Sequence, residues 1–152
     1  ALPQLIVQDK SWKLVMAPRH AVPNALKEML KSLQVERYVD WKDDVPIENY
    51  VAMADVVVLP YLSLQGTEGN PSCMLEAMAC KTPVITSDLP ELREIADGCV
   101  HFTPSGDVDV LGRMLRAVLG KSDKMMMERA YTKAKEFDAT SIAKEFLKVY
   151  GS

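Results

Sequence analysis

The chain has 152 residues, of which 48% are hydrophobic and 26% are charged, and its formal net charge at pH 7 is −3. This length and composition are typical of one globular domain with its own core. The negative balance disfavours a nucleic-acid-binding protein, and no apolar run is long enough to predict a membrane-spanning helix. The three cysteines, Cys73, Cys80 and Cys99, lack metal-type spacing and predict free thiols in a cytoplasmic setting.

Short segments rich in branched residues alternate with helix-forming segments up to about residue 103. Buried parallel strands are predicted at residues 13–17, 37–41, 55–59, 84–86 and 100–103. Helices are predicted between them at residues 23–33, 46–53, 71–80 and 90–96, each with a proline near its start. This alternation predicts an α/β fold, with a Rossmann-like parallel sheet of about five strands flanked by helices.

The C-terminal segment is predicted to be helical only. Helices are expected at residues 108–119, from about 123 to 137, and at 139–150, with Asp107, Ser122 or Asp123, and Asp138 as N-caps. Gly98 suits the position just past the helix at 90–96. The chain begins without Met, in what is expected to be the tail of a helix. The sequence therefore suggests a fragment of a longer protein.

The segment from Thr67 to Ala79 is expected to start a helix between two buried strands. Asn70 can cap that helix, and Pro71 suits its first turn. The next residues would then offer free N–H groups to an anion such as a phosphate, which the helix dipole also favours. The amides expected to do so belong to Gly69, Ser72, Cys73 and Met74.

Two carboxylates flank this predicted anion site. Glu68 precedes the helix, and Glu76 follows eight positions later inside it. Carboxylates accept hydrogen bonds from hydroxyl groups, so groups that carry hydroxyls are expected on either side of the anion. A sugar, a diphosphate and a ribose follow one another in this order in a nucleotide sugar. An ordinary surface helix can also begin this way, but the flanking strands predict that this helix starts at the carboxyl edge of a parallel sheet, where α/β proteins bind ligands.

Residues 50–60, the Glu68 and Glu76 pair, and residues 75–88 together resemble the C-terminal domain of group 1 glycosyltransferases. These are retaining enzymes with the GT-B fold, and they use a nucleotide-diphosphate sugar. Their hallmark is two Glu separated by seven residues, which positions 68 and 76 match. The resemblance continues through residues 92–98, 104–107 and 137–150, and it covers the chain from about residue 12 to 150.

The resemblance implies a role for each matching residue. Glu76 would accept hydrogen bonds from the ribose, and Glu68, the expected catalytic residue, would contact the donor sugar near its reacting carbon. The loop and helix start facing the diphosphate would comprise Gly69, Asn70, Pro71, Ser72, Cys73, Met74 and Leu75. Arg19 would contact phosphate or base, and Trp41 would stack on the base, although Trp41 also suits a core position. No metal or other cofactor is expected, since the donor is a substrate.

The sequence departs from the family pattern in three places. Asn70-Pro71 stands where the family has a bulky apolar residue, and Ala17-Pro-Arg-His20 replaces a Gly-rich turn. A basic pair that neutralises the diphosphate lies, in the family, before the point where this chain starts. Residues 1–152 are therefore expected to be the C-terminal donor-binding domain alone. Its partner would be the N-terminal acceptor domain of the same enzyme, through which any membrane contact would be made.

The whole enzyme is expected to be a retaining, hexosyltransferase-type enzyme that transfers a glycosyl group to a hydroxyl acceptor, whereas the fragment alone is not expected to turn over. The alternative is a non-catalytic GT-B-like module that binds a nucleotide or a protein partner. A nucleotide-sugar epimerase or a glycogen synthase also remains open. A Rossmann dehydrogenase is disfavoured because no G-x-G-x-x-G follows any predicted strand.

Overall fold

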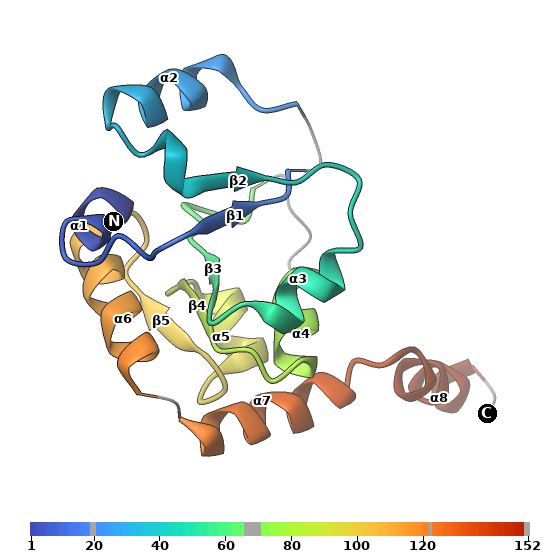
Figure 1. Ribbon diagram of the computed structural model, residues 1–152. Helices are drawn as coiled ribbons and strands as arrows, with labels where there is room; N and C mark the ends of the chain where they lie inside the picture. Colours follow the sequence, from blue (N-terminus) through green and yellow to red (C-terminus); the bar gives the residue numbers. More distant parts are fainter. Residues whose placement is uncertain (19–20, 66–70, 122, 151–152) are drawn as a thin grey trace. The chain divides into compact units, whose positions relative to one another are not determined.

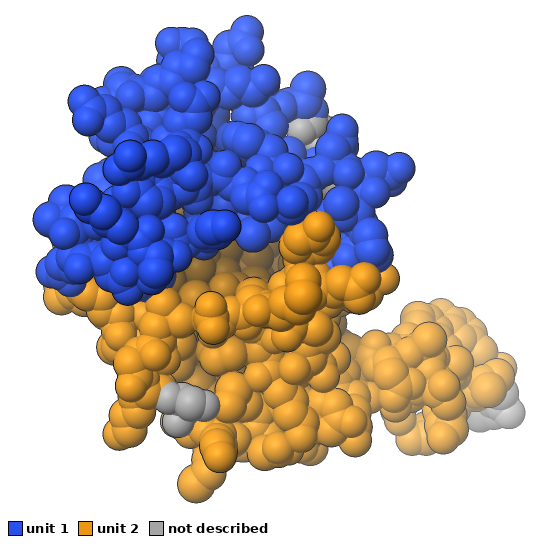
Figure 2. All heavy atoms as spheres, viewed as in Figure 1, with its two compact units in different colours: residues 1–47 blue, residues 48–152 orange. Residues whose placement is uncertain are grey.

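The computed structural model describes residues 1–18, 21–65, 71–121 and 123–150. The chain divides into two compact units, residues 1–47 and residues 48–152 (Figure 2). Each unit has its own parallel sheet (Figure 1). Each also buries its own set of apolar side chains.

The first unit contains a two-stranded parallel sheet, with Leu14 opposite Val39 and Met16 opposite Trp41. Its elements are α1 (Leu2–Ile6), β1 (Leu14–Met16), α2 (Asn24–Ser32), the 3-10 turn η1 (Glu36–Tyr38) and β2 (Val39–Trp41). Their apolar side chains form one buried cluster, made of Ile6, Leu30, Val35 and Tyr38. Burial of these side chains is what holds such short elements together, because three-residue strands supply few hydrogen bonds.

The second unit contains a three-stranded parallel sheet in the order β3-β4-β5. Its elements are α3 (Ile47–Met53, which begins at the boundary between the units), β3 (Val57–Leu59), α4 (Ser72–Ala79), β4 (Val84–Ser87), α5 (Pro90–Ala96), β5 (His101–Thr103), α6 (Val108–Gly120), α7 (Lys124–Lys135) and α8 (Ala139–Tyr150). Ile85 is opposite both Val58 and His101, so β4 is the central strand, and all four of its residues are buried.

The helices of the second unit bury apolar residues at helical spacing. On α4 these are Met74, Ala77 and Met78, all fully buried, and on α5 they are Leu92 and Ala96. Residues three or four apart lie on one helix face, so each helix presents one apolar stripe. α4 packs against both β3 and β4 and also against α7. The side chains of α8, in contrast, are exposed except for that of Ser141.

The expected parallel strands and flanking helices are confirmed, but the strands do not form a single sheet. Among the described residues the five strands pair in two sheets, one in each unit. Four of the strands are shorter than predicted, while β4 is one residue longer, and a 3-10 turn takes the start of the strand expected at residues 37–41. Periodicity marks a buried segment well, but the ends of the hydrogen-bonded ladder depend on the neighbouring strand.

The expected polar caps are confirmed. Asp107 accepts a hydrogen bond from the Val110 N–H at 2.9 Å, and Asp123 accepts one from the Met126 N–H at 3.0 Å. Asp138 accepts one from the Thr140 N–H at 2.7 Å and one from the Ser141 N–H at 3.0 Å. Gly98, just past α5, has a φ of 71°, a conformation that suits glycine.

One local expectation is wrong. Pro71, expected in the first turn, occupies the N-cap position of α4 with an extended backbone (φ −64°, ψ 112°). Asn70, the expected cap, lies outside the described residues, so its capping role stays a prediction. Cys80, one of the three cysteines predicted to be free thiols, is free and exposed at the C-cap of α4. In the part of the chain that the structure describes, every helix is too short or too polar to cross a membrane.

Candidate functional site

The carboxyl edge of the β3-β4-β5 sheet gathers three loops and the start of α4. Parallel strands end at the same edge, so the residues that follow them come together there. Tyr61 follows β3, Asp88 follows β4, and Ser105 follows β5. The first turn of α4 is reached from the same edge, because α4 connects the end of β3 to the start of β4.

The start of α4 offers backbone N–H groups, but fewer than predicted. The Met74 N–H donates to the Pro71 carbonyl oxygen at 3.0 Å, so the expectation that this amide is free is wrong. The reason is that the first turn is tight at this point, so the Met74 amide reaches the carbonyl three residues before it. Among the described residues, the amides of Ser72 and Cys73 have no hydrogen-bond partner. These two remain as donors for an anion.

Glu76 lies one turn after Ser72, on the helix face opposite to the buried Met74 and Met78. Its side chain is half-buried. Within the described ranges no cation or hydrogen-bond donor is paired with its carboxylate. A partly buried carboxylate is usually paired, since removing it from water costs free energy. Glu76 is therefore well suited to accept hydrogen bonds from a ligand.

The other predicted residues of α4 divide by burial. Pro71, Cys73 and Leu75 are half-buried, and Ser72 is exposed. Met74 is fully buried, so its side chain is part of the core and cannot contact a ligand. The structure thus brings Ser72, Cys73 and Glu76 together on the accessible side of one helix.

Four predicted site residues lie outside the described residues. These are Arg19, Glu68, Gly69 and Asn70, and the same is true of His20. Their roles stay predictions.

Trp41, expected to stack on a base, belongs to the first unit. It is half-buried and packs against the cluster of Ile6, Leu30, Val35 and Tyr38. This is the core position that the sequence also allowed. Its stacking role stays a prediction.

Tyr61 and Ser105 are site-edge residues that were not among the predicted ligand contacts. Tyr61 is half-buried, and burial, with a smaller effect from the neighbouring Cys73, raises the pKa of its phenol. The Ser105 hydroxyl donates to the carbonyl oxygens of Tyr61 at 2.9 Å and Leu62 at 3.0 Å. The place of Tyr61 after a predicted strand put it at this edge, whereas the turn at residues 104–107 does not reveal that Ser105 contacts the same segment.

Asp88 at the end of β4 is held by Arg93 of α5. Hydrogen bonds from this guanidinium lower the pKa of the Asp88 carboxyl group below its usual range. Arg93 also donates to Asp97 at 2.9 Å and lies 4.5 Å from the centre of the Phe102 ring. Because Asp88 is already paired, its charge is partly neutralised at the edge where an anion would bind.

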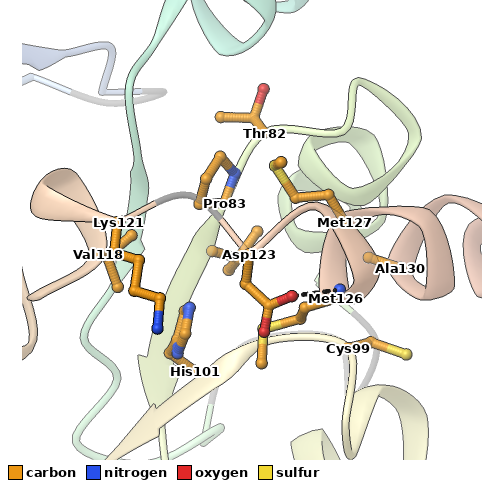
Figure 3. A pocket seen from close by; sticks show the side chains of 11 residues that line it. Thr82, Pro83, Cys99, His101, Val118, Lys121, Asp123, Met126, Met127 and Ala130 are labelled. Carbon is orange, nitrogen blue, oxygen red and sulfur yellow. Dashed lines mark hydrogen bonds between the residues drawn. The ribbon is translucent and has the colours of Figure 1, made fainter.

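A small cavity lies at the opposite, amino-terminal edge of the same sheet (Figure 3). It is lined by residues around the starts of β4 and β5 and the α6–α7 junction, including Thr82, Cys99, His101, Lys121 and Asp123. Its volume of about 10 Å³ is near that of one water molecule, which excludes a nucleotide. In the described part of the chain, no group of three or more His, Cys, Asp or Glu side chains is placed to hold a metal ion.

The chain is similar in sequence to known glycosyltransferases. The family described as "Glycosyl transferases group 1" matches residues 1–121. The phosphatidyl-myo-inositol mannosyltransferase of Mycobacterium leprae (strain TN) is 32% identical over 120 residues, which are 75% of this chain and 31% of that protein. The corresponding protein of Mycolicibacterium smegmatis (strain ATCC 700084 / mc(2)155) is 27% identical over 156 residues, 99% of this chain and 39% of that protein.

Solved structures show the same fold. The crystal structure of Anabaena Alr3699/HepE in complex with UDP has a TM-score of 0.84 at 18% identity, covering 99% of this chain and 44% of that one. The chain thus spans less than half the length of each of these three proteins. Because the family match covers most of its residues, the chain belongs to the group 1 glycosyl transferases.

Proposed function

We propose that this chain binds a nucleotide-diphosphate sugar as the C-terminal donor domain of a retaining glycosyltransferase. The whole enzyme would transfer a hexosyl group to a hydroxyl acceptor held by an N-terminal domain. The observation that carries the proposal is Glu76, a half-buried carboxylate without a described partner. It lies one turn inside a helix whose Ser72 and Cys73 amides have no partner among the described residues. Membership of the group 1 family supports the reaction class.

The proposed binding mode follows from charge and geometry. The diphosphate would accept hydrogen bonds from the Ser72 and Cys73 amides, where the helix dipole stabilises negative charge. Glu76 would accept hydrogen bonds from the ribose hydroxyls, and Glu68 would orient the sugar. Donors fixed at the leaving diphosphate stabilise the charge that develops on it during transfer. The UDP bound in the Alr3699/HepE crystal structure supports a nucleotide diphosphate as the ligand class.

The mechanism assigned to the chain itself is therefore donor binding and leaving-group stabilisation. No residue described here is proposed as a nucleophile, and no metal is proposed to take part. Localisation in the cytoplasm and attachment to a membrane through other parts of the enzyme are parts of the same proposal.

Thermal unfolding of the chain with a panel of ligands tests this function. We expect UDP, GDP or ADP to raise the melting temperature, because a ligand at 100 times its Kd stabilises the folded state by about 2.7 kcal/mol. The matching nucleoside monophosphate should stabilise the chain less, since it lacks the second phosphate. If all three diphosphates leave the melting temperature unchanged, donor binding by this chain is contradicted and an interaction module becomes the better account.

Kinetic measurement of glycosyl transfer by the complete protein distinguishes the roles of the two carboxylates. Glu68→Ala should mainly slow transfer, while Glu76→Ala should mainly weaken nucleotide binding. Near-normal kinetics in both variants would refute the assignment.

A further inference from the structure

The turn after β5 has a defined geometry. The Asp107 N–H donates to the Pro104 carbonyl oxygen at 3.2 Å, and Gly106 has a φ of 78°. A four-residue turn with a positive φ at its third residue is a type II turn, in which glycine is strongly favoured. Asp107 then caps α6. Ser105 is thus carried by a turn fixed at both ends, by β5 and by α6.

This turn is fastened to the segment that follows β3. The Ser105 hydroxyl donates to Tyr61 O at 2.9 Å and to Leu62 O at 3.0 Å, across 44 residues of sequence. A Cβ placed on Gly106 would lie 3.5 Å from the Leu62 Cδ2 atom, so the turn and this segment are in packing contact. Leu62 itself is 77% exposed, and apolar burial therefore contributes little to holding the segment in place.

The backbone that Ser105 holds carries Tyr61. Tyr61 is the second residue after β3, and its side chain neighbours Cys73, whose amide is one of the two open donors of α4. The position of the Tyr61 backbone therefore determines where the phenol lies relative to the start of the helix. A hydroxyl bonded to two successive carbonyl oxygens restrains the peptide unit between them.

We propose that Ser105 is a positioning residue for diphosphate binding, which it serves by holding the Tyr61–Leu62 backbone beside the first turn of α4. This inference rests on the proposed function, because it concerns the same ligand and the same helix start. Ser105 acts through the loop and need not touch the ligand. It would preorganise the loop, so that less conformational freedom is lost on binding.

Substitution at Ser105 tests the proposal in the chain itself. Ser105→Ala removes the donor, and calorimetric titration with UDP, GDP and ADP should show about three- to tenfold weaker binding of the diphosphate that the wild type binds. Ser105→Thr keeps a hydroxyl and should restore wild-type affinity. The melting temperature without ligand should change little, since Ser105 is exposed.

Ser32→Ala is the matched control. The Ser32 hydroxyl donates to the Met29 carbonyl oxygen at 2.8 Å at the end of α2, so the same chemical group is lost from another exposed serine. This variant should bind the diphosphate as the wild type does.

Four outcomes overturn the inference. Wild-type affinity in Ser105→Ala would show that the hydroxyl has no role in binding, while the proposed function would stand. Equal weakening in Ser105→Ala and Ser32→Ala, or no recovery in Ser105→Thr, would show a general effect on the fold. Absence of binding in the wild type would instead contradict the proposed function itself, and the inference with it.

Discussion

The Arg93 guanidinium donates to both oxygens of the Asp88 carboxylate, from Nε to Oδ1 at 2.5 Å and from a terminal nitrogen to Oδ2 at 2.9 Å. This two-point contact ties α5 to the end of β4 at the carboxyl edge of the sheet. Planar, paired hydrogen bonds of this kind are a property of arginine that lysine does not reproduce. The Asp88 N–H also donates to the Thr103 carbonyl oxygen at 2.7 Å, so the residue is held by both backbone and side chain.

Replacing Arg93 should raise the pKa of the Asp88 carboxyl group. The hydrogen bonds from Arg93 are the largest cause of its lowered pKa, so Arg93→Gln should return the value toward the usual range. Arg93→Lys should give an intermediate pKa, because it keeps the charge and loses the two-point geometry. Titration followed by NMR of the Asp88 side-chain carboxyl carbon measures this directly. An unchanged pKa in Arg93→Gln would show that the pair does not form in solution.

Lys81 ends α4 in a conformation that normally selects glycine. Its φ is 58°, its N–H donates to Met78 O at 3.1 Å, and the Thr82 N–H donates to Ala77 O at 3.0 Å, which together form a Schellman motif. The Lys81 ammonium group binds both oxygens of Glu128 on α7, at 2.7 and 2.9 Å.

Comparison of Lys81→Gly with Lys81→Ala isolates the backbone contribution, because both variants lose the ion pair. Glycine adopts a positive φ without steric cost, so Lys81→Gly should be more stable than Lys81→Ala by about 1 kcal/mol. The exposed ion pair itself should contribute about 0–1 kcal/mol. Urea unfolding of the wild type and both variants measures these free energies. The glycine variant against the alanine variant gives the backbone contribution, and the wild type against the alanine variant gives the contribution of the lost side-chain contacts. Equal stability of the glycine and alanine variants would contradict the positive φ at this position.

His101 should make the fold sensitive to mild acid. Its side chain lines the cavity of Figure 3 with Lys121, Asp123 and Cys99. Burial lowers the pKa of His101 below its ordinary value of 6.5, and the Asp123 carboxylate opposes this with a smaller effect. The unfolded chain therefore takes up a proton more readily than the folded chain, and stability falls as the pH drops from 6.5 through the lower pKa of the folded state.

Unfolding measured between about pH 7.5 and 5.5 tests this effect, since the lowered carboxyl pKa values act at more acidic pH. His101→Gln should lose less stability than the wild type over this range. The sequence has two histidines, so the comparison is also made in a His20→Gln background, where His101 is the one remaining imidazole. An identical loss of stability in wild type and His101→Gln would contradict the lowered pKa.

The sequence predicted most features that depend on one residue and its near neighbours. Asp107, Asp123 and Asp138 cap helices because a carboxylate can reach amides two or three residues ahead. Gly98 was predicted just past α5 because the backbone conformation at that position depends only on the neighbouring residues. Pro71 was misplaced by one position, since its fixed φ suits both the N-cap and the first turn, and the extended ψ of 112° decides between them.

Features that join distant segments could not be predicted in this way. Ser105 and Tyr61 are 44 residues apart, and Lys81 and Glu128 are 47 apart. Periodicity indicates which face of an element is buried, but it does not indicate which loops meet at the edge of a sheet. For the same reason, the division of five strands into two sheets was not visible in the sequence. At the candidate site, the role of Glu76 was predicted from its spacing from Glu68 and stays a prediction. The bond that occupies the Met74 amide could not be predicted, because it depends on the geometry of the first turn.

The central claim is that Glu76 holds the ribose of a nucleotide bound at the start of α4. The most direct measurement is the affinity of wild type and Glu76→Ala for the nucleoside diphosphate that binds and for inorganic pyrophosphate, with Glu94→Ala, an exposed α5 residue, as the control. Loss of hydrogen bonds to a charged group should weaken nucleotide binding about ten- to a hundredfold in Glu76→Ala, and leave pyrophosphate binding and the Glu94→Ala variant unchanged. Wild-type nucleotide affinity in Glu76→Ala, or an equal loss for both ligands, would contradict the account.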